Sequence, residues 1–308
     1  MMRCNQRDGV IIMQAPRQHI SLLPVLALLL SATMWGLFWI PLRWLESLGI
    51  SGLQATFLIY IGTLVVSLPI LVIKRAEWRQ QPALMFAIMI SSGWCNTAFI
   101  LAILDGEIMR VILLFYLSPL WSTVLGRLVL KEQLGTLAYL TLVLAVIGAL
   151  LILWEPQLGM PWPSSTADWL AMSSGFAFAF TNLFTHMASQ TSIKTKTVAA
   201  WLGVILLSGV ALLISDGSVG VSNTTGIMMA LLIGLVLMTV MTFAVVYGVT
   251  HLPVHRSAII LLFQVVVAAV SSYLFTEERL VWHEWFGGII VIIAAYLAIT
   301  HQARRTAL

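Results

Sequence analysis

Long apolar runs, separated by short polar connections, fill almost the whole chain. The runs lie at roughly 20–42, 51–73, 82–104, 108–130, 135–154, 167–188, 197–215, 224–248, 256–276 and 282–301. Each is near the length of about 20 apolar residues that a helix needs to cross the hydrocarbon core of a bilayer. The pattern predicts an all-α polytopic membrane protein with ten transmembrane helices and no second, soluble domain.

The fourth and fifth runs return as the ninth and tenth, displaced by 146 positions without a gap. In this alignment Arg110 falls on Arg256, and Glu132 falls on Glu278. Five helices are an odd number, so the second copy enters the membrane from the opposite face and the two five-helix repeats are inverted. The predicted layout is a cytoplasmic tail at 1–18, a first repeat at 19–155, an external linker at 156–165, a second repeat at 166–302 and a cytoplasmic tail at 303–308. Many secondary transporters are built this way, and an inert duplicated scaffold is the alternative.

Composition excludes a soluble core. Hydrophobic residues are 60% of the chain and charged residues 9%, against about 45–50% and about 25% in soluble domains. The first run resembles a secretory signal, but it continues through Trp35 and Trp39 without a small-residue cleavage site, so we interpret it as a retained helix. Cys4 and Cys95 lie too far apart in this layout to bridge and suggest neither redox nor metal chemistry, so no cofactor is expected.

The basic residues predict the orientation in the membrane. With the amino terminus in the cytoplasm, thirteen of the sixteen Lys and Arg fall on the inner side, Lys196 among them. This bias fits the positive-inside rule for a bacterial-type inner membrane, with both termini cytoplasmic. The net charge of +4 is then an orientation signal and not a sign of nucleic-acid binding. The expected partners are the bilayer and a small-molecule substrate, and monomer and homodimer both stay open.

Polar and aromatic residues in the middle of the predicted helices are the candidates for substrate binding, because such groups in lipid must face a cavity or another helix. They are Trp35, Tyr60, Ser92, Trp94, Asn96, Tyr116, Ser118, Asn182, Tyr247 and Gln264. Asn96 and Gln264 are the most informative, since each amide needs partners that hydrocarbon cannot offer. The alternative, that these amides only hold neighbouring helices together, has equal weight.

Three further residues are candidates for gating. Pro119 removes a backbone hydrogen bond from the middle of the fourth helix and predicts a kink there, although membrane helices also tolerate proline passively. Arg110 and Arg256 share one repeat position near the starts of the fourth and ninth helices. A cation at a helix amino terminus needs compensation by lipid phosphate, an acid or an anionic substrate group. Extension of each arginine toward the lipid headgroups is the alternative to gating.

Several motifs are absent from the sequence. It contains no Gly-x-x-x-x-Gly-Lys phosphate loop and no Gly-x-Ser-x-Gly, so neither ATP hydrolysis nor esterase-type catalysis is expected. All twelve Asp and Glu fall in tails, loops or helix ends. Proton-coupled carriers usually employ intramembrane acids, so we expect transport to be facilitated or only loosely coupled.

Short motifs within the predicted helices and at two of their junctions resemble a known family. They are Trp35-Gly36 with Phe38, Asn96 to Ala102, Leu117 to Leu120, Lys131 to Leu134 with Gly148, Ser173 to His186, Glu277 to Leu280, and Gly287-Gly288. In combination with the repeat they resemble the drug/metabolite transporter superfamily, in its ten-helix EamA branch. This resemblance implies a basket of helices around a central cavity and the movement of small metabolites or amino acids across the inner membrane, often outward. Gln264-Val265 departs from the Ser118-Pro119 of the first repeat and leaves the substrate open.

The sequence therefore predicts a secondary transporter that exports amino acids or similar small metabolites by alternating access, without ATP. A carrier of another solute, such as a sugar derivative, a nucleobase or a drug, is the nearest alternative. An intramembrane enzyme or sensor is the alternative from a different class. Against it, the sequence offers no convincing pair of a buried nucleophile and a base, and no soluble output domain.

Overall fold

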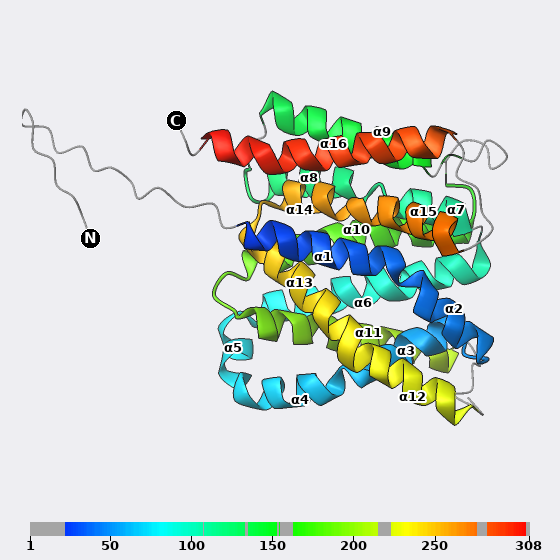
Figure 1. The fold of residues 1–308 in the computed structure, drawn as a ribbon. Coiled ribbons are helices and arrows are strands. Elements are labelled where there is room, and N and C mark those ends of the chain that lie inside the picture. Colours follow the sequence, from blue (N-terminus) through cyan, green and yellow to red (C-terminus); the bar gives the residue numbers. More distant parts are fainter. Residues whose placement is uncertain are drawn as a thin grey trace, which may run out of the picture.

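The computed structural model describes residues 22–106, 108–132, 135–152, 154, 163–214, 223–275 and 282–305. These residues form helices and short connections, with no strand among them, so the all-α prediction is confirmed. Figure 1 shows the helices running back and forth between two ends of one bundle. The predicted tail at 1–18, most of the predicted linker and the Glu277 to Leu280 motif lie outside the described residues.

The helices of the first half are α1 (Leu23–Leu37), α2 (Trp39–Ser47), α3 (Gly52–Gly62), α4 (Leu64–Ile73), α5 (Arg75–Gln80), α6 (Pro82–Asp105), α7 (Ile108–Phe115), α8 (Ser118–Leu128) and α9 (Thr136–Ile152). Those of the second half are α10 (Thr166–Met187), α11 (Ile193–Ile214), α12 (Thr224–Ile233), the π-helical turn η2 (Gly234–Met238), α13 (Thr239–His251), α14 (Val254–Leu261), α15 (Phe263–Phe275) and α16 (Trp282–Arg305).

The described helices confirm a membrane-spanning bundle but account for only part of the ten predicted spans. Six spans are long and apolar enough to cross a bilayer, and the bent pair α3–α4 makes a seventh. The apolar parts of α9 and α16 lie where spans are predicted but are shorter, with bounds at Thr136–Ile152 and Trp282–Leu297. Helix α10 has 22 residues and is rich in Ser, Thr and Gly, and it is not among the long apolar spans.

Contacts at the two ends of the bundle show that the halves are inverted. At one end, called here the α5 end, the Glu77 carboxylate of α5 accepts hydrogen bonds from Ser192 N (3.0 Å) and Thr195 Oγ1 (2.7 Å). Ser192 lies in the connection from α10 to α11, and Thr195 lies in the first turn of α11. At the opposite end, Arg110 near the start of α7 pairs with Asp168 near the start of α10 at 2.9 Å. Helix α10 therefore runs toward the α5 end, whereas α1 begins there (Figure 1).

Several helices are broken near the middle of the bundle. Helix α1 gives way to α2 at Phe38, and α3 gives way to α4 at Thr63 with a bend of 44°. Helix α7 ends at Phe115, which is four residues before Pro119 and carries the carbonyl that a proline ring displaces. The helix is therefore interrupted where Pro119 predicts a kink, although α7 and α8 together still form one span, Arg110–Leu128. Helix α14 is broken from α15 at Leu262.

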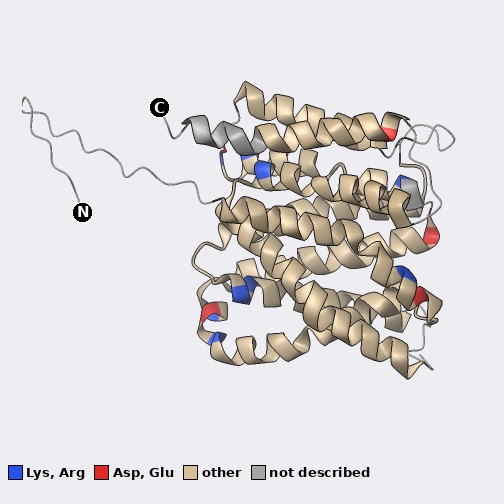
Figure 2. Ribbon diagram, in the orientation of Figure 1, with Lys and Arg blue, Asp and Glu red and all other residues tan. Residues whose placement is uncertain are grey.

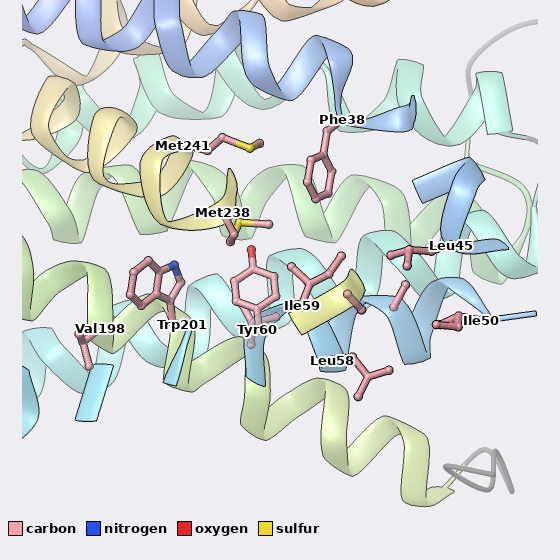
Figure 3. Packing of buried hydrophobic residues seen from close by; sticks show 13 residues of the cluster. Phe38, Leu45, Ile50, Leu58, Ile59, Tyr60, Val198, Trp201, Met238 and Met241 are labelled. Atoms are coloured by element: carbon pink, nitrogen blue, oxygen red, sulfur yellow. The ribbon is translucent and has the colours of Figure 1, made fainter. Parts of the chain in front are cut away.

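The largest core cluster joins the two halves. It contains Tyr60 of α3, Trp201 of α11 and Met238 of η2, and Figure 3 shows the Tyr60 ring among these side chains. Helices α6 and α11 cross closely where Gly93 meets Gly203. A Cβ atom on Gly203 would lie 1.9 Å from the Met89 carbonyl oxygen, so only glycine allows this approach. The contact between the two halves thus depends on small residues at the helix crossing as well as on large residues in the core.

Candidate functional site

The first polar group at mid-bundle joins α3 to α6. The Tyr60 hydroxyl donates to Asn96 Oδ1 at 3.1 Å, and Asn96 Nδ2 donates to the Ser92 carbonyl at 2.9 Å. Tyr60 is buried, and it lies three residues before the break at Thr63. In this conformation the Asn96 amide therefore holds two helices together, which is the structural role that the sequence left open, at a place where the backbone of α3 is already interrupted.

The second polar group joins the two halves. The Tyr116 hydroxyl, in the break between α7 and α8, faces the Gln264 side chain, which lies just after the break between α14 and α15. Both side chains are half-buried. Each half thus contributes one broken helix to this contact. Discontinuous helices are where many transporters place their substrate sites, because unwound turns expose backbone groups and permit bending.

Aromatic rings connect these two polar groups. The Phe115 ring lies 5.0 Å from that of Phe99, 5.5 Å from that of Tyr116 and 5.7 Å from that of Phe178. Phe99 follows Asn96 by one helical turn on α6, so it shares a face with that amide. We call the following residues the central cluster: Tyr60, Asn96, Phe99, Phe115, Tyr116, Phe178 and Gln264.

Sequence reasoning missed three members of the central cluster. Phe99, Phe115 and Phe178 lie within apolar runs, where a phenylalanine carries no signal by itself. Helical spacing from a polar candidate would have found Phe99, three residues after Asn96, and sequence adjacency would have found Phe115, next to Tyr116. Phe178 could not have been found in this way, because it belongs to another helix, α10.

Three other predicted binding residues lie close to the breaks or inside the bundle. The Trp35 ring packs 5.3 Å from Phe38, at the α1–α2 break, and belongs to the same core as Tyr60. Ser118 is buried at the first position of α8. Asn182 is 4% exposed on α10, and its Nδ2 has no hydrogen-bond partner within the described part of the chain. Its unused donor makes Asn182 a further candidate for contact with a ligand.

Two predicted binding residues lie away from the central cluster. Trp94 is 44% exposed, and its indole Nε1 donates to Ser173 Oγ at 3.2 Å. Residues two apart on a helix do not share a face, so Trp94 and Asn96 point to different sides of α6. The Tyr247 ring lies 4.4 Å from the His251 ring, tilted by 39°, near the end of α13 at the α5 end. The structure does not bring either residue to the mid-bundle contacts.

The candidate gating arginines have different surroundings. Arg110 is compensated by Asp168, whose carboxylate is 3% exposed, so an acid and not a lipid phosphate neutralises it here. The Asp168 carboxylate also accepts from Ser164 N and Ser165 N at the start of α10. Arg256 lies in the first turn of α14 and lines a small cavity at the α5 end, together with residues of α9 and α16.

Fixed charges lie at the two ends of the described bundle and not in its middle (Figure 2). One of them differs from the sequence-based placement. Lys196 was expected before the start of the seventh span, yet α11 begins at Ile193 and buries Lys196 in its first turn. Glu77 of α5, in the connection between α4 and α6, is a partly exposed charge at the same end of the bundle. Burial raises its pKa, but hydrogen bonds from Lys74, Ser192 and Thr195 outweigh this and lower the pKa to about 2.

These features define a class of protein. Apolar spanning helices, two inverted halves and broken helices that meet at neutral polar groups are the architecture of a multi-pass membrane transporter. The model of the EamA-like transporter family matches residues 22–154 and again 165–300, and the chain belongs to this family. Its members are transporters and not enzymes, so the alternative of an intramembrane enzyme is discarded.

Individual relatives add less detail. The chain is 28% identical over 146 residues to the uncharacterised transporter PA0485 of Pseudomonas aeruginosa, and this match covers 46% of each protein. The aligned part thus spans about half the length of that relative. A crystal structure of another protein superposes with a TM-score of 0.76 at 13% identity and covers 92% of this chain and 97% of that one. At this identity, the superposition shows a shared fold only.

Proposed function

We propose that this EamA-family transporter exports amino acids or similar small metabolites across the inner membrane by alternating access, with both termini in the cytoplasm. The observation that supports the proposal is the central cluster. It joins the two inverted halves at mid-bundle and carries amides, phenols and ring faces. Of the described residues, those with a fixed charge lie at the bundle ends (Figure 2).

The chemistry of the central cluster suits a zwitterion. Aromatic faces attract an ammonium group through their quadrupole, and the Phe115 ring lies 5.0 Å from that of Phe99 and 5.5 Å from that of Tyr116. Tyr60 and Asn96 offer hydroxyl and amide donors for a carboxylate. A substrate with balanced charge needs no buried counter-ion, and so it fits a cluster that offers none.

Binding and opening would use the contacts that the protein now makes with itself. A substrate that takes over the hydrogen bond of Tyr60 with Asn96, or that comes between Tyr116 and Gln264, replaces a contact between helices by a contact with ligand. The breaks beside these residues, including the one at Pro119, allow the outer and inner segments of a helix to move separately. On this proposal Arg110 with Asp168 closes the outer end, and Arg256 belongs to the inner end.

A planar solute is the second candidate. The ring faces of the central cluster would also stack on a nucleobase or an aromatic drug. A sugar derivative would instead favour the amides and hydroxyls. Competition among these classes for one labelled substrate discriminates between them, because only the true substrate class displaces it at low concentration.

The decisive experiment is uptake into proteoliposomes with a panel of labelled amino acids, sugar derivatives and nucleobases. We expect amino acids to be transported, and Asn96→Ala and Gln264→Ala to reduce transport strongly while expression stays nearly unchanged and stability in detergent falls by no more than the roughly 1 kcal/mol of a single hydrogen bond. Gln80→Ala is the matched control, because it removes an exposed amide at the end of α5. Equal losses of folding and transport would show that both amides only brace helices. Transport of none of the amino acids would overturn the proposed substrate class.

A further inference from the structure

Lys196 is the most deeply buried charged side chain among the described residues, with 1% of its surface exposed. Its ammonium group donates to the Thr185 carbonyl and to Thr250 Oγ1, each at 3.0 Å. Both partners are neutral. Lys194, one half-turn earlier on α11, is exposed to solvent. A buried ammonium is costly to desolvate, so its position calls for a specific physical explanation.

The explanation lies in the helices that surround it. Thr185 belongs to the last turn of α10, which ends at Met187, and Thr250 belongs to the last turn of α13, which ends at His251. A helix carboxyl end carries about half a negative charge, together with carbonyls that lack intrahelical partners. The Lys196 ammonium thus sits between two such ends. Together the two helix ends carry about one negative charge, the charge of one carboxylate.

A histidine strengthens the same contact. Val249 O, in the last turn of α13, cannot receive the usual backbone hydrogen bond from residue 253, because Pro253 has no N–H. The His186 ring on α10 fills this place, with Nδ1 at 3.0 Å from Val249 O. Adjacent residues on α10, Thr185 and His186, are therefore tied to the end of α13 by two separate contacts. One of these contacts passes through Lys196.

Lys196 also lies next to a link between the two halves. Its neighbour Thr195 donates to Glu77 of α5 at 2.7 Å, and so fixes the start of α11 against the first half. The ends of α10 and α13 are thereby tied, through the first turn of α11, to the connection between α4 and α6. Separation of α10 from α13 at the α5 end requires the ammonium to leave at least one of its two acceptors.

We propose that Lys196 is the residue that holds the inner gate closed, where the inner gate means the last turns of α10 and α13 and the first turn of α11. Its ammonium joins two helix carboxyl ends, and its release is the step that opens the α5 end. The assignment of this end to the cytoplasm rests on the proposed function. Lys196 affects transport through the helix ends that it positions. Its own hydrogen bonds are to Thr185 and Thr250, not to the central cluster.

The test measures the gate directly by spin-label distances. The labels replace Gln190 and His251, two exposed residues beside the ends of α10 and α13, in a background with Cys4→Ser and Cys95→Ser. We expect Lys196→Met to raise the ratio of long to short distances by about tenfold, equivalent to about 1.4 kcal/mol. Lys196→Arg keeps the charge and donors and should stay close to the parent protein. Lys194→Met, the matched control, should leave the distances unchanged.

Each result decides the proposal. A folded Lys196→Met protein with the distances of the parent would overturn it, as would an equal effect of Lys194→Met. If Lys196→Met does not fold, Thr250→Val removes one acceptor only and should shift the ratio in the same direction by a smaller factor; an unchanged ratio in this variant would also overturn it. The measurement needs no substrate. If the protein transports no amino acid but the Lys196→Met variant opens, the proposed function is refuted and the proposed role of Lys196 in the gate is supported.

Discussion

Helices α7–α8 and α14–α15 occupy equivalent places in the two halves, yet only the first pair contains a proline. α7 spans Ile108–Phe115 and α14 spans Val254–Leu261, so both begin and end at positions 146 apart. Pro119 follows the first break, and Val265 stands at the equivalent place after the second. A proline is therefore not needed for such a break, and Pro69 inside the continuous helix α4 shows that a proline does not always cause one.

Local hydrogen bonding is similar at the two breaks. Leu117 N donates to Leu114 O at 3.3 Å, and Leu262 N donates to Ile259 O at 3.2 Å, so in both halves the helix tightens to three-residue steps. Tyr116 and Gln264 face each other across these breaks. We infer that packing of one half against the other sustains the second break, which has no proline.

The ends of the two helices are held by different means. Arg110 of the first half pairs with Asp168, whereas the start of α14 in the second half is held by Glu132, which accepts from Val254 N at 3.0 Å and contacts His255 Nδ1 at 2.5 Å. Each contact links one half to the other, at opposite ends of the bundle. The first half is therefore held by an ion pair with a permanently charged arginine, and the second half by a pair that contains a histidine.

The largest expected effect comes from the outer ion pair. Asp168→Ala leaves the Arg110 guanidinium, 15% exposed, without its carboxylate. Loss of one partner of a buried pair costs about 3–5 kcal/mol, so we expect a loss of this size in the free energy of unfolding, measured by denaturant titration in detergent. Asp105→Ala removes an exposed acid at the end of α6 and is the control. Equal, small losses for both variants would show that the pair does not hold α7 to α10.

A smaller loss is expected at the inner end. Glu132→Gln keeps an acceptor for Val254 N but removes the charge that faces His255, and hydrogen bonds to charged groups contribute about 1.5–3 kcal/mol. Denaturant titration of this variant checks the value, with the exposed Glu46→Gln as control. A loss below that of the control would mean that the second half holds its α14 end without the glutamate.

This inner contact also predicts a pH dependence. Burial raises the pKa of Glu132, but the hydrogen bond and charge of His255 and the Val254 N–H outweigh this, and its pKa lies below the ordinary value of 4.5. The carboxylate therefore stabilises the folded state fully above about pH 4.5, and this contribution is lost as pH falls through the lowered pKa. The difference in stability between the parent and Glu132→Gln should shrink as pH falls below about 4.5. A difference that grows on acidification would contradict the assignment.

Tyr116 and Gln264 face each other between the two breaks, and a hydrogen bond between them contributes about 1 kcal/mol. Tyr116→Phe and Gln264→Leu, alone and together, form a double-mutant cycle. We expect a coupling free energy of about 0.5–1.5 kcal/mol in thermal unfolding, since each side chain is the partner of the other. Purely additive effects would show that the breaks are sustained by the apolar contacts around them and not by this bond.

The smallest effect is expected from a proline placed in the second half. Val265→Pro copies the arrangement of the first half at a helix that is already broken, and it removes only the contact of Val265 N with Leu262 O at 3.0 Å. We expect a cost of about 1 kcal/mol or less. Val291→Pro, in the unbroken α16, should cost about 3 kcal/mol or more. Similar, large costs for both would show that α14–α15 depends on a continuous backbone.

The sequence determined the architecture because lipid leaves few solutions. Every backbone group inside a bilayer must bond within its own segment, so the length and apolarity of each run predict a spanning helix without knowledge of its neighbours. The repeat follows from residue identity alone, and the equal bounds of α7 and α14 bear out the register that aligned Arg110 with Arg256. Asn96 and Gln264 were also identifiable, because an amide in hydrocarbon is costly wherever it lies.

Only the tertiary structure decided which groups meet. Asn96 pairs with Tyr60 because α3 and α6 are neighbours, and Trp94 lies elsewhere because of its place on the same helix. The break at Leu262 has no local signal, and Lys196 reads as an ordinary residue of a connection until the ends of α10 and α13 are seen to enclose its ammonium. The physical reason is common to all of these. A side chain carries its own cost of burial in its chemistry, but its partner is set by helices that approach from distant parts of the chain, at crossings such as that of Gly93 with Gly203.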